Sequence, residues 1–395
     1  MAALNNASFP RRGFSLKARK KVVKVQRIPY KKPNIIVQPY MRPAARNFMR
    51  SMMLKPNERV VIFPDRRARA FAEALSEQIR NTGCTAQIIE LTPQHDWLRG
   101  KYLSAITNAL RSSQASIYLG FAGTLETEKI GDYLVKKIQE EKLTRHISLG
   151  ELSPELIKRV LAVRPERMRR LTQVVYDSVE NSRIIKINSP SGTNLTIEIN
   201  PEYARWFPDA DILPRGYYTN LPAGEVFTAP SNVNGRLVAN GVVDVFNSVG
   251  TAKMPLEMEI RNGRILFENV KCADRRVLGE FMGKIMQRNG DKIGEFSLST
   301  NPFLPEMLNR PSTLVDEKRL PAIAAGNPLA HDTKCRAYSS RTHIDMTIPK
   351  ANIWVDGKLL MKNGGYVPEI WNKWGKISDA EALTFLKEWQ NSNLQ

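Results

Sequence analysis

The chain contains little cysteine and little histidine, with three cysteines and four histidines among its 395 residues. Cys84, Cys272 and Cys335 are odd in number and far apart, which argues against a disulfide framework and favours a reducing compartment. No window holds 18 or more continuous apolar residues, so we expect no transmembrane helix. The N-terminus also lacks the apolar stretch of a secretory signal. These absences favour a cytoplasmic protein.

Acidic residues are missing from one part of the chain. The first 55 residues hold 14 lysines or arginines and no aspartate or glutamate, whereas the remainder holds 45 basic and 39 acidic residues. The net charge of +20 therefore comes mainly from an N-terminal arm. Residues 11–55 could bind nucleic acid or an anionic surface. The acid-free stretch 11–32 also fits an organelle transit peptide, and a solvated leader is a third interpretation.

The length of the chain favours two or three domains. Residues 1–45 are predicted to be an extended, disordered arm, because prolines recur there among the charges. Residues 46–165 form the first predicted domain. Residues 166–395 form the second, which carries the chemistry described below.

Strand-like and helical segments alternate in the first predicted domain. The strands are expected at Arg59–Pro64, Thr85–Leu91 and Ala115–Phe121, with helices at Ala68–Asn81 and Leu103–Leu110. This order predicts parallel βαβ units and a small doubly wound α/β domain. The turn after the first strand, Pro64-Asp65-Arg66-Arg67, has no glycine-rich nucleotide loop, so no nucleotide cofactor is expected there.

The pattern changes after a predicted bridging helix at Pro165–Asn181. Short strands separated by hairpin turns follow, with Asn262-Gly263 as the strongest turn signal. We therefore expect an α+β domain with a largely antiparallel sheet. Its strands are predicted at 184–187, 195–199, 236–239, 258–260, 264–267, 295–299, 342–348 and 352–355, and a helix at 276–286.

The most informative segment is Thr342-His343-Ile344-Asp345-Met346-Thr347. Side chains alternate along a strand, so His343 and Asp345 share one face. An imidazole nitrogen and a carboxylate two residues apart can bind one cation there. His-x-Asp alone is a weak signal, because a histidine on a strand is more often a structural residue.

Two further segments supply carboxylates directly after a glycine. They are LPAGEVFTAP, residues 221–230 with Glu225, and GEFSLSTNP, residues 294–302 with Glu295. A glycine beside a ligand lets the backbone approach closely. The alternative is that both glutamates are exposed carboxylates at strand edges, which is the commoner place for Glu.

These segments together resemble the thermophilic metalloaminopeptidases, the aminopeptidase T and aminopeptidase S family. The resemblance covers roughly residues 46–375 and is strongest over 215–365. It rests on the order and spacing of LPAGEVFTAP, GEFSLSTNP, VDEK, THIDM, WVDGK and NGG.

The resemblance implies a two-metal peptidase that removes N-terminal residues from peptides, with zinc, cobalt or manganese ions and a homodimeric assembly. Glu225 falls on a ligand of one metal, and Glu295 on a carboxylate near both. His343 and Asp345 fall on ligands of the second metal. Glu225 and Glu295 are the residues expected to take part in catalysis.

One family ligand is missing from this chain. After Asp316-Glu317-Lys318 the family carries a metal-binding histidine, and here Ala322 takes its place. His331 is a candidate replacement, because His95 and His146 fall in the first predicted domain. No tyrosine lies at the position where the family carries one; Tyr338 lies further along the chain and is a candidate for substrate binding. Arg341, directly before the ligand strand, could hold a substrate carboxylate or pair with a nearby acid.

The missing ligand leaves two other hypotheses open. A branch of the same fold, the 2,5-dihydroxypyridine dioxygenases, opens an aromatic ring with one iron and also lacks that histidine. It would be expected to have a histidine in place of Glu295. The second alternative is an inactive relative that is used for binding.

Overall fold

The computed structural model describes residues 35–92, 97–121, 125–161, 163–211, 214–245, 255–304 and 313–394. Ile36–Gln395 form one compact unit. Most of the basic arm, together with His95, lies outside the described residues. The domain boundary after residue 165 stays a prediction.

Helix α1 (Met41–Met52) begins inside the segment that we expected to be extended up to residue 45. Its apolar side chains lie on one face, and Phe48 packs edge-on against Phe71 with ring centroids 6.3 Å apart. Pro43 fits because the first-turn N–H groups of a helix have no intrahelical partner. Tertiary packing therefore extends the ordered chain further towards the N-terminus than composition indicated.

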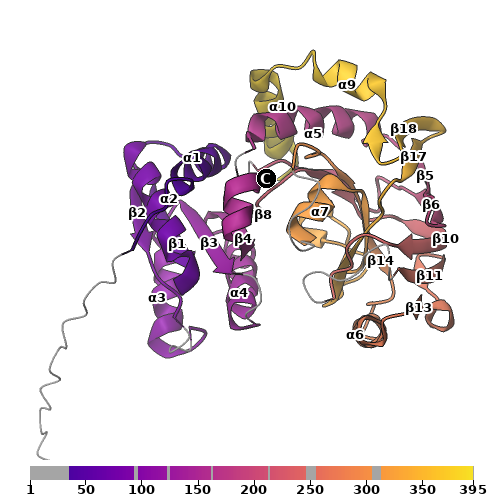
Figure 1. Cartoon of the computed structure of the whole chain (residues 1–395), viewed down its shortest axis with the longest axis horizontal. Coiled ribbons are helices and arrows are strands. Elements are labelled where there is room, and N and C mark those ends of the chain that lie inside the picture. The colour runs from indigo at the N-terminus through magenta and orange to yellow at the C-terminus, as the bar shows by residue number, and fades with distance from the viewer. Residues whose placement is uncertain are drawn as a thin grey trace, which may run out of the picture. The chain divides into compact units, whose positions relative to one another are not determined.

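A parallel sheet forms the first part of the compact unit (Figure 1). Every neighbouring pair of its strands is parallel, as the alternation of strands and helices predicted. The order across the sheet is β2 (Thr85–Ile88), β1 (Arg59–Pro64), β3 (Ala115–Phe121), β4 (Arg145–Leu152) and β8 (Tyr218–Asn220).

Helices cover both faces of this sheet. Val60 and Ile62 of β1 join the core formed with α1 and α2 (Arg69–Asn81). Val61 and Phe63 point to the other face and join the core formed with α3 (Gly100–Arg111) and α4 (Leu125–Glu141). This alternation is that of a strand buried on both sides, and it confirms the doubly wound α/β prediction.

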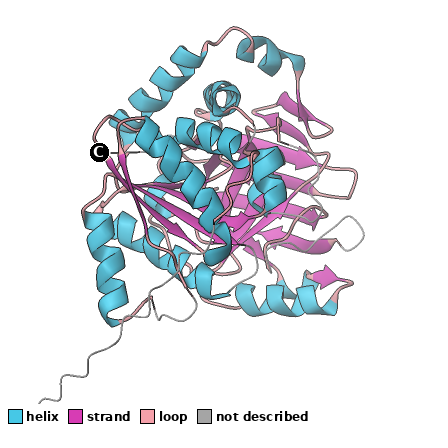
Figure 2. Ribbon diagram, turned by 60° about the vertical axis from the view of Figure 1, so that its left-hand side comes forward, coloured by secondary structure: helices cyan, strands magenta, loops and turns pink. Residues whose placement is uncertain are grey.

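A large antiparallel sheet lies in the second part (Figure 2). Its neighbouring strands pair antiparallel throughout, as expected from the hairpin signals. The order is β12 (Arg264–Ile265), β11 (Leu256–Arg261), β10 (Asn232–Ala239), β6 (Asn194–Glu198), β5 (Ile184–Asn188), β17 (Asn352–Val355), β18 (Lys358–Lys362) and β19 (Gly365–Tyr366), and β13 (Lys271–Cys272) pairs with β11.

A second antiparallel sheet positions the candidate site. Its order is β16 (His343–Thr347), β15 (Ala322–Gly326), β14 (Ile293–Ser299), β9 (Glu225–Thr228) and β7 (Phe207–Asp209). Apolar residues of one face, such as Phe296, Ile323 and Ile344, share a core with the large sheet. Because side chains alternate, the residues between them project to the opposite face, where the polar groups gather.

Helices complete the second part. Helix α5 (Pro165–Val179) places Leu171, Val174 and Val175 in the core of the two sheets, close to the predicted bridging helix. The others are α6 (Arg275–Ile285), α7 (Thr313–Arg319), α8 (Ala330–Thr333), α9 (Pro368–Trp374) and α10 (Asp379–Asn393), with short turns of other helix types at Arg66–Ala68, Leu156–Val160 and Phe267–Asn269. Among the described residues, no helix is long and apolar enough to cross a membrane.

Candidate metal centre

Strand register brings two of the predicted ligands into one row. Ala324 of β15 pairs with Glu295 of β14 on one side and with Asp345 of β16 on the other. Gly326 of β15 pairs with His343. All the members of the row project to the polar face of the sheet. The short side chain of Ala324 leaves the space above it to the longer side chains of its neighbours.

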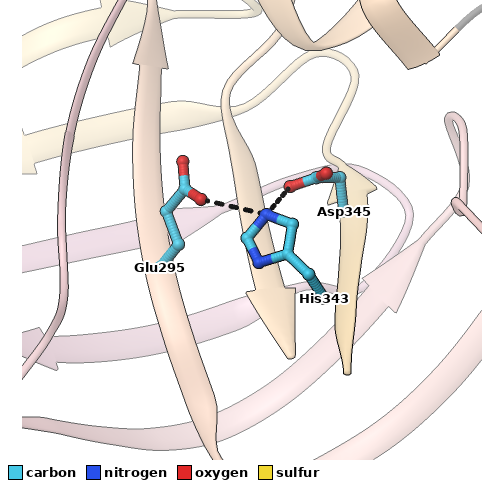
Figure 3. Close-up of side chains that lie close together, drawn as sticks. All are labelled: Glu295, His343 and Asp345. Carbon is cyan, nitrogen blue, oxygen red and sulfur yellow. Dashed lines mark ion pairs between the residues drawn. The ribbon is translucent and has the colours of Figure 1, made fainter. Parts of the chain in front are cut away.

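Three predicted ligands converge in that space (Figure 3). Nε2 of His343 lies 3.4 Å from Oε2 of Glu295 and 3.4 Å from Oδ1 of Asp345. One ligand atom from each residue lies within 4.8 Å of the other two. The carboxylates are buried, whereas the imidazole keeps 29% of its side-chain surface exposed towards a cavity. The three side chains form a group that could hold a metal ion.

Burial and the charges of the neighbouring ligands together set the pKa values of the three side chains. Burial alone would lower the pKa of His343, but the carboxylates of Asp345 and Glu295 outweigh it and raise the pKa well above its usual value. Burial raises the pKa of Glu295, partly opposed by the imidazole. Burial acts in the same direction on Asp345, but His343 outweighs it and lowers the pKa of that carboxyl. The imidazole therefore neutralises carboxylates that a cation would otherwise neutralise.

The spacing of the donor atoms fits a small divalent ion. Two ligand atoms bound at about 2.0–2.1 Å in tetrahedral geometry lie roughly 3.3–3.4 Å apart. The two separations from Nε2 of His343, 3.4 Å each, match that value. A set of one imidazole and two carboxylates also suits zinc, cobalt or manganese. In the described part of the chain, Nδ1 of His343 is buried without a hydrogen-bond partner.

Glu225 lies on the same sheet face but outside this group. It pairs with Ser299 of β14 and with Asp209 of β7. Its carboxylate Oε1 accepts a hydrogen bond from the ammonium of Lys318. Gly224 has a φ of 124°, and a Cβ there would lie 2.7 Å from the Cβ of Asn301. The glycine before this glutamate is thus required by conformation and by close packing.

Sequence reasoning did not single out Lys318, which the structure buries at the centre of a second cluster. Its side chain is 3% exposed. Nζ lies 3.1 Å from Oε1 of Glu317 and 3.9 Å from Oδ2 of Asp209, in addition to its contact with Glu225. The VDEK segment was the available signal. A lysine among acidic residues usually lies on a solvated face, so the sequence alone did not indicate burial.

Burial and the ammonium oppose each other on these carboxyls. Burial raises the pKa of Glu317 to about 8 and that of Asp209 to about 6, although Lys318 lowers both. Burial likewise raises the pKa of Glu225 well above its usual value, against the effect of Lys318. Burial would lower the pKa of Lys318, but the three carboxylates outweigh it and raise the pKa instead. Lys318 is therefore a charged group at neutral pH.

Two cavities give access to both clusters. The larger has a volume of about 770 Å³ and is lined by Tyr118, Ser148, Tyr218, Glu317, His343 and Asp345, among others. The smaller, about 120 Å³, is lined by residues of both clusters, including Glu225, Glu295, Lys318 and His343. A ligand in these cavities would meet the metal-binding group and the Lys318 cluster together.

The remaining candidate residues do not join the three ligands. Nδ1 of His331 lies 3.1 Å from Oδ1 of Asp332, and its ring packs on Tyr217 with centroids 4.2 Å apart. His331 lines the larger cavity. The hydroxyl of Tyr338 donates to the carbonyl of Ile293 at 3.3 Å, and Arg341 is exposed. Their predicted roles stay predictions.

His146 has a structural role within β4. Its Nδ1 lies 2.8 Å from the hydroxyl of Ser116, and burial lowers its pKa to about 3. A neutral, buried imidazole that is held by a hydroxyl in this way belongs to the core of the parallel sheet.

Comparison with known proteins places this geometry within a known fold. No protein-family model and no curated protein sequence matches the chain. Wild-type AmpT from Thermus thermophilus is similar in structure, with a TM-score of 0.64 and 17% identity, over 83% of this chain and 99% of that one. The fold is metalloaminopeptidase-like.

A second solved structure is similar to nearly the same degree. The 2,5-dihydroxypyridine dioxygenase from Pseudomonas putida KT2440 aligns with a TM-score of 0.62 and 15% identity, over 83% of this chain and 97% of that one. The metalloaminopeptidase-like fold alone therefore does not select a reaction. The choice rests on the residues of the site.

Proposed function

We propose that this protein is a metal-dependent hydrolase of the aminopeptidase kind, which removes N-terminal residues from peptides. Its divalent ion would be held by Glu295, His343 and Asp345. The observation that carries the proposal is the convergence of these three side chains on one point, with 3.4 Å between Nε2 of His343 and each carboxylate.

A divalent ion bound there would supply Lewis acidity and would lower the pKa of a water molecule towards neutrality. The protein contributes the fixed positions of the ligands. Glu295 and Asp345 hold theirs because β15 carries only Ala324 between them. Two carboxylates and one imidazole favour a hydrolytic ion over the two-histidine, one-carboxylate set of iron oxygenases.

Glu317 is the residue that we propose to move the proton. It lines both cavities, and its pKa is raised by burial to about 8. A carboxyl with a pKa near the working pH exchanges a proton efficiently in both directions. Its carboxylate oxygen would take a proton from the attacking water and return it to the departing amine.

Carboxylates around the larger cavity also favour a cationic substrate end. The free amine of a peptide is positively charged, and Asp132, Glu151 and Asp345 line that cavity. Clustered acidic groups at low-dielectric walls attract such an amine. A volume of about 770 Å³ accommodates the first residues of a short peptide.

The test is hydrolysis of aminoacyl-p-nitroanilides by metal-free protein supplied in turn with zinc, cobalt or manganese. We expect activity that chelation removes and metal restores. Glu317→Gln should lower kcat by about 100-fold or more, the range of general acid–base catalysis. Glu202→Gln, at an exposed position, is the matched control. Absence of hydrolysis with every metal would refute the proposal.

A mononuclear iron ring-cleaving dioxygenase is the second candidate. It is favoured by the presence of one group of three ligands among the residues that the structure describes, and by the similarity to the Pseudomonas enzyme. Ferrous protein would then consume oxygen in the presence of 2,5-dihydroxypyridine, and zinc protein would not hydrolyse peptides. Measuring both reactions on the same preparation separates the two candidates.

A further inference from the structure

A buried cation that belongs to the chain lies beside the candidate metal group. The Lys318 side chain is 3% exposed, and its Nζ contacts one carboxylate oxygen from each of three residues, Asp209, Glu225 and Glu317. Those carboxylates are themselves 10–11% exposed. Three carboxylates around one point form an oxygen-lined cation site, which the ammonium fills.

Strand register places this cluster next to the metal group. Asp209 and Glu225 pair directly, and Glu225 pairs with Ser299, which projects to the same face of β14 as Glu295. Helix α7 brings Glu317 and Lys318 to that face. Both clusters line the smaller cavity. They therefore form two adjacent positions in one polar pocket.

Burial of the three carboxyl groups favours a counter-charge at the second position. Buried carboxylates are costly unless they are paired, and Lys318 is the charged partner that the structure provides for all three. A divalent ion among the same oxygens would lie against the ammonium, and like charges at that distance in a low dielectric repel strongly. The ammonium and a second metal ion exclude each other.

The strand beside the second position offers no replacement donor. Ala322 of β15 pairs with Ser297 and projects to the polar face. Along the sheet it lies between the level of Ala324, which belongs to the metal group, and the level of Glu225. Its methyl group cannot bind a metal ion. The residues present therefore fit one metal ion and do not fit a second.

We infer that the Lys318 ammonium is a built-in cation at this second position, so that the protein binds one divalent ion, and that removal of the ammonium opens an oxygen-ligand site for another. The inference deepens the proposed function and rests on it for the first ion. The vacated site would take a hard ion such as Mn²⁺, because all its donors are carboxylate oxygens.

The experiment counts Mn²⁺ ions bound per chain by calorimetric titration and electron paramagnetic resonance of full-length, metal-free protein. We expect one ion for the wild type and two for Lys318→Met, whose side chain follows the aliphatic part of lysine and ends before the position of the ammonium. Lys318→Arg, which keeps the charge, is the matched control and should bind one. Lys318→Met/Glu225→Gln should lose the added ion.

The two proposals fail in distinguishable ways. Lys318→Met/His343→Ala should retain one ion, at the second position only. No ion in the wild type together with one in Lys318→Met would refute the metal group and support the built-in cation. Two ions in the wild type, or a folded Lys318→Met that binds no more than the wild type, would overturn the inference.

The inference can also be tested if Lys318→Met does not fold in the absence of metal. Three buried carboxyl groups without a cationic partner would destabilise the metal-free fold, and Mn²⁺ should then restore the fold and raise the thermal midpoint. The same addition should not stabilise Lys318→Met/Glu225→Gln to that extent. A Lys318→Met chain that stays unfolded at saturating Mn²⁺ would overturn the inference.

Discussion

Nε2 of His343 lies 3.4 Å from Oε2 of Glu295, although strand β15 separates the strands that carry them. The contact crosses a whole strand because β15 presents only small residues to that face, Ala322, Ala324 and Gly326. Glutamate is long enough to reach over a methyl group towards the imidazole. Small size at β15 is thus a condition for the site.

Ala324→Val should therefore weaken metal binding by about tenfold or more, because added methyl groups would separate Glu295 from Asp345. Overpacking should also cost about 1–3 kcal/mol of stability. Ala325→Val is the matched control, since Ala325 lies on the same strand and projects into the apolar core. Calorimetric affinities at equal stability separate the two effects. Equal loss of affinity in both variants would exclude a specific role for Ala324.

His343→Ala should remove the imidazole donor and reduce affinity for zinc by at least about 100-fold, more than the loss of an outer-shell partner. The physical reason is that one of three converging donors disappears while both carboxylates remain buried. Competition with a zinc-sensitive dye measures the affinity. Glu388→Gln, an exposed change on α10, should leave it unchanged. Wild-type affinity in His343→Ala would place the metal elsewhere.

The pair Arg169–Asp211 should be a major contributor to stability. Nε and Nη2 of Arg169 donate to the two carboxylate oxygens at 2.8 and 2.9 Å, and the side chains are 5% and 0% exposed. Removing one partner of a buried pair leaves the other charge buried and unpaired, so Asp211→Asn should lower the free energy of unfolding by about 3–5 kcal/mol.

An exposed pair provides the comparison. Nη2 of Arg236 lies 2.6 Å from Oε2 of Glu257, with 50% and 34% of the side chains exposed. Glu257→Gln should cost only about 0–1 kcal/mol, because solvent screens the attraction. Urea unfolding gives both values. Similar costs for the two substitutions would contradict the assignment of Arg169 and Asp211 to a buried pair.

Metal-free protein should lose stability as the pH rises. The pKa of Glu317 is about 8 in the fold, against an ordinary value of 4.5, so the folded protein holds a proton that the unfolded chain releases. The contribution of Glu317 to the stability of the fold is then greatest below pH 4.5 and declines as the pH rises to about 8. The loss should be on the order of a few kcal/mol.

Glu317→Gln tests the source of this pH dependence. The amide cannot ionise, so the slope between about pH 6 and 8 should flatten, while Asp209 retains its contribution below about pH 6. Urea unfolding in the presence of a chelator at several pH values measures the slope. Glu202→Gln should keep the wild-type slope. A Glu317→Gln slope equal to that of the wild type would assign the proton to another group.

Local patterns along the chain determined much of the architecture. The βαβ order, the hairpin at Asn262-Gly263 and the shared face of His343 and Asp345 follow from periodicity and turn chemistry, and the structure has each of them. The segment from Met41 differs, because its helix depends on packing against α2. A helix that is stabilised by a distant partner leaves a weaker local signal than one with its own caps.

In the candidate site, too, some features follow from local sequence and others from tertiary packing. Sequence by itself determined which residues could bind a metal, because residue chemistry and alternation on a strand are local properties. Only the tertiary structure decided that Glu295 reaches His343 across Ala324, and that Glu225 faces an ammonium. The burial of Lys318 depends on where α7 packs, and no spacing in the VDEK segment encodes that. Strand register and helix placement set these distances, and both are outcomes of packing the whole chain.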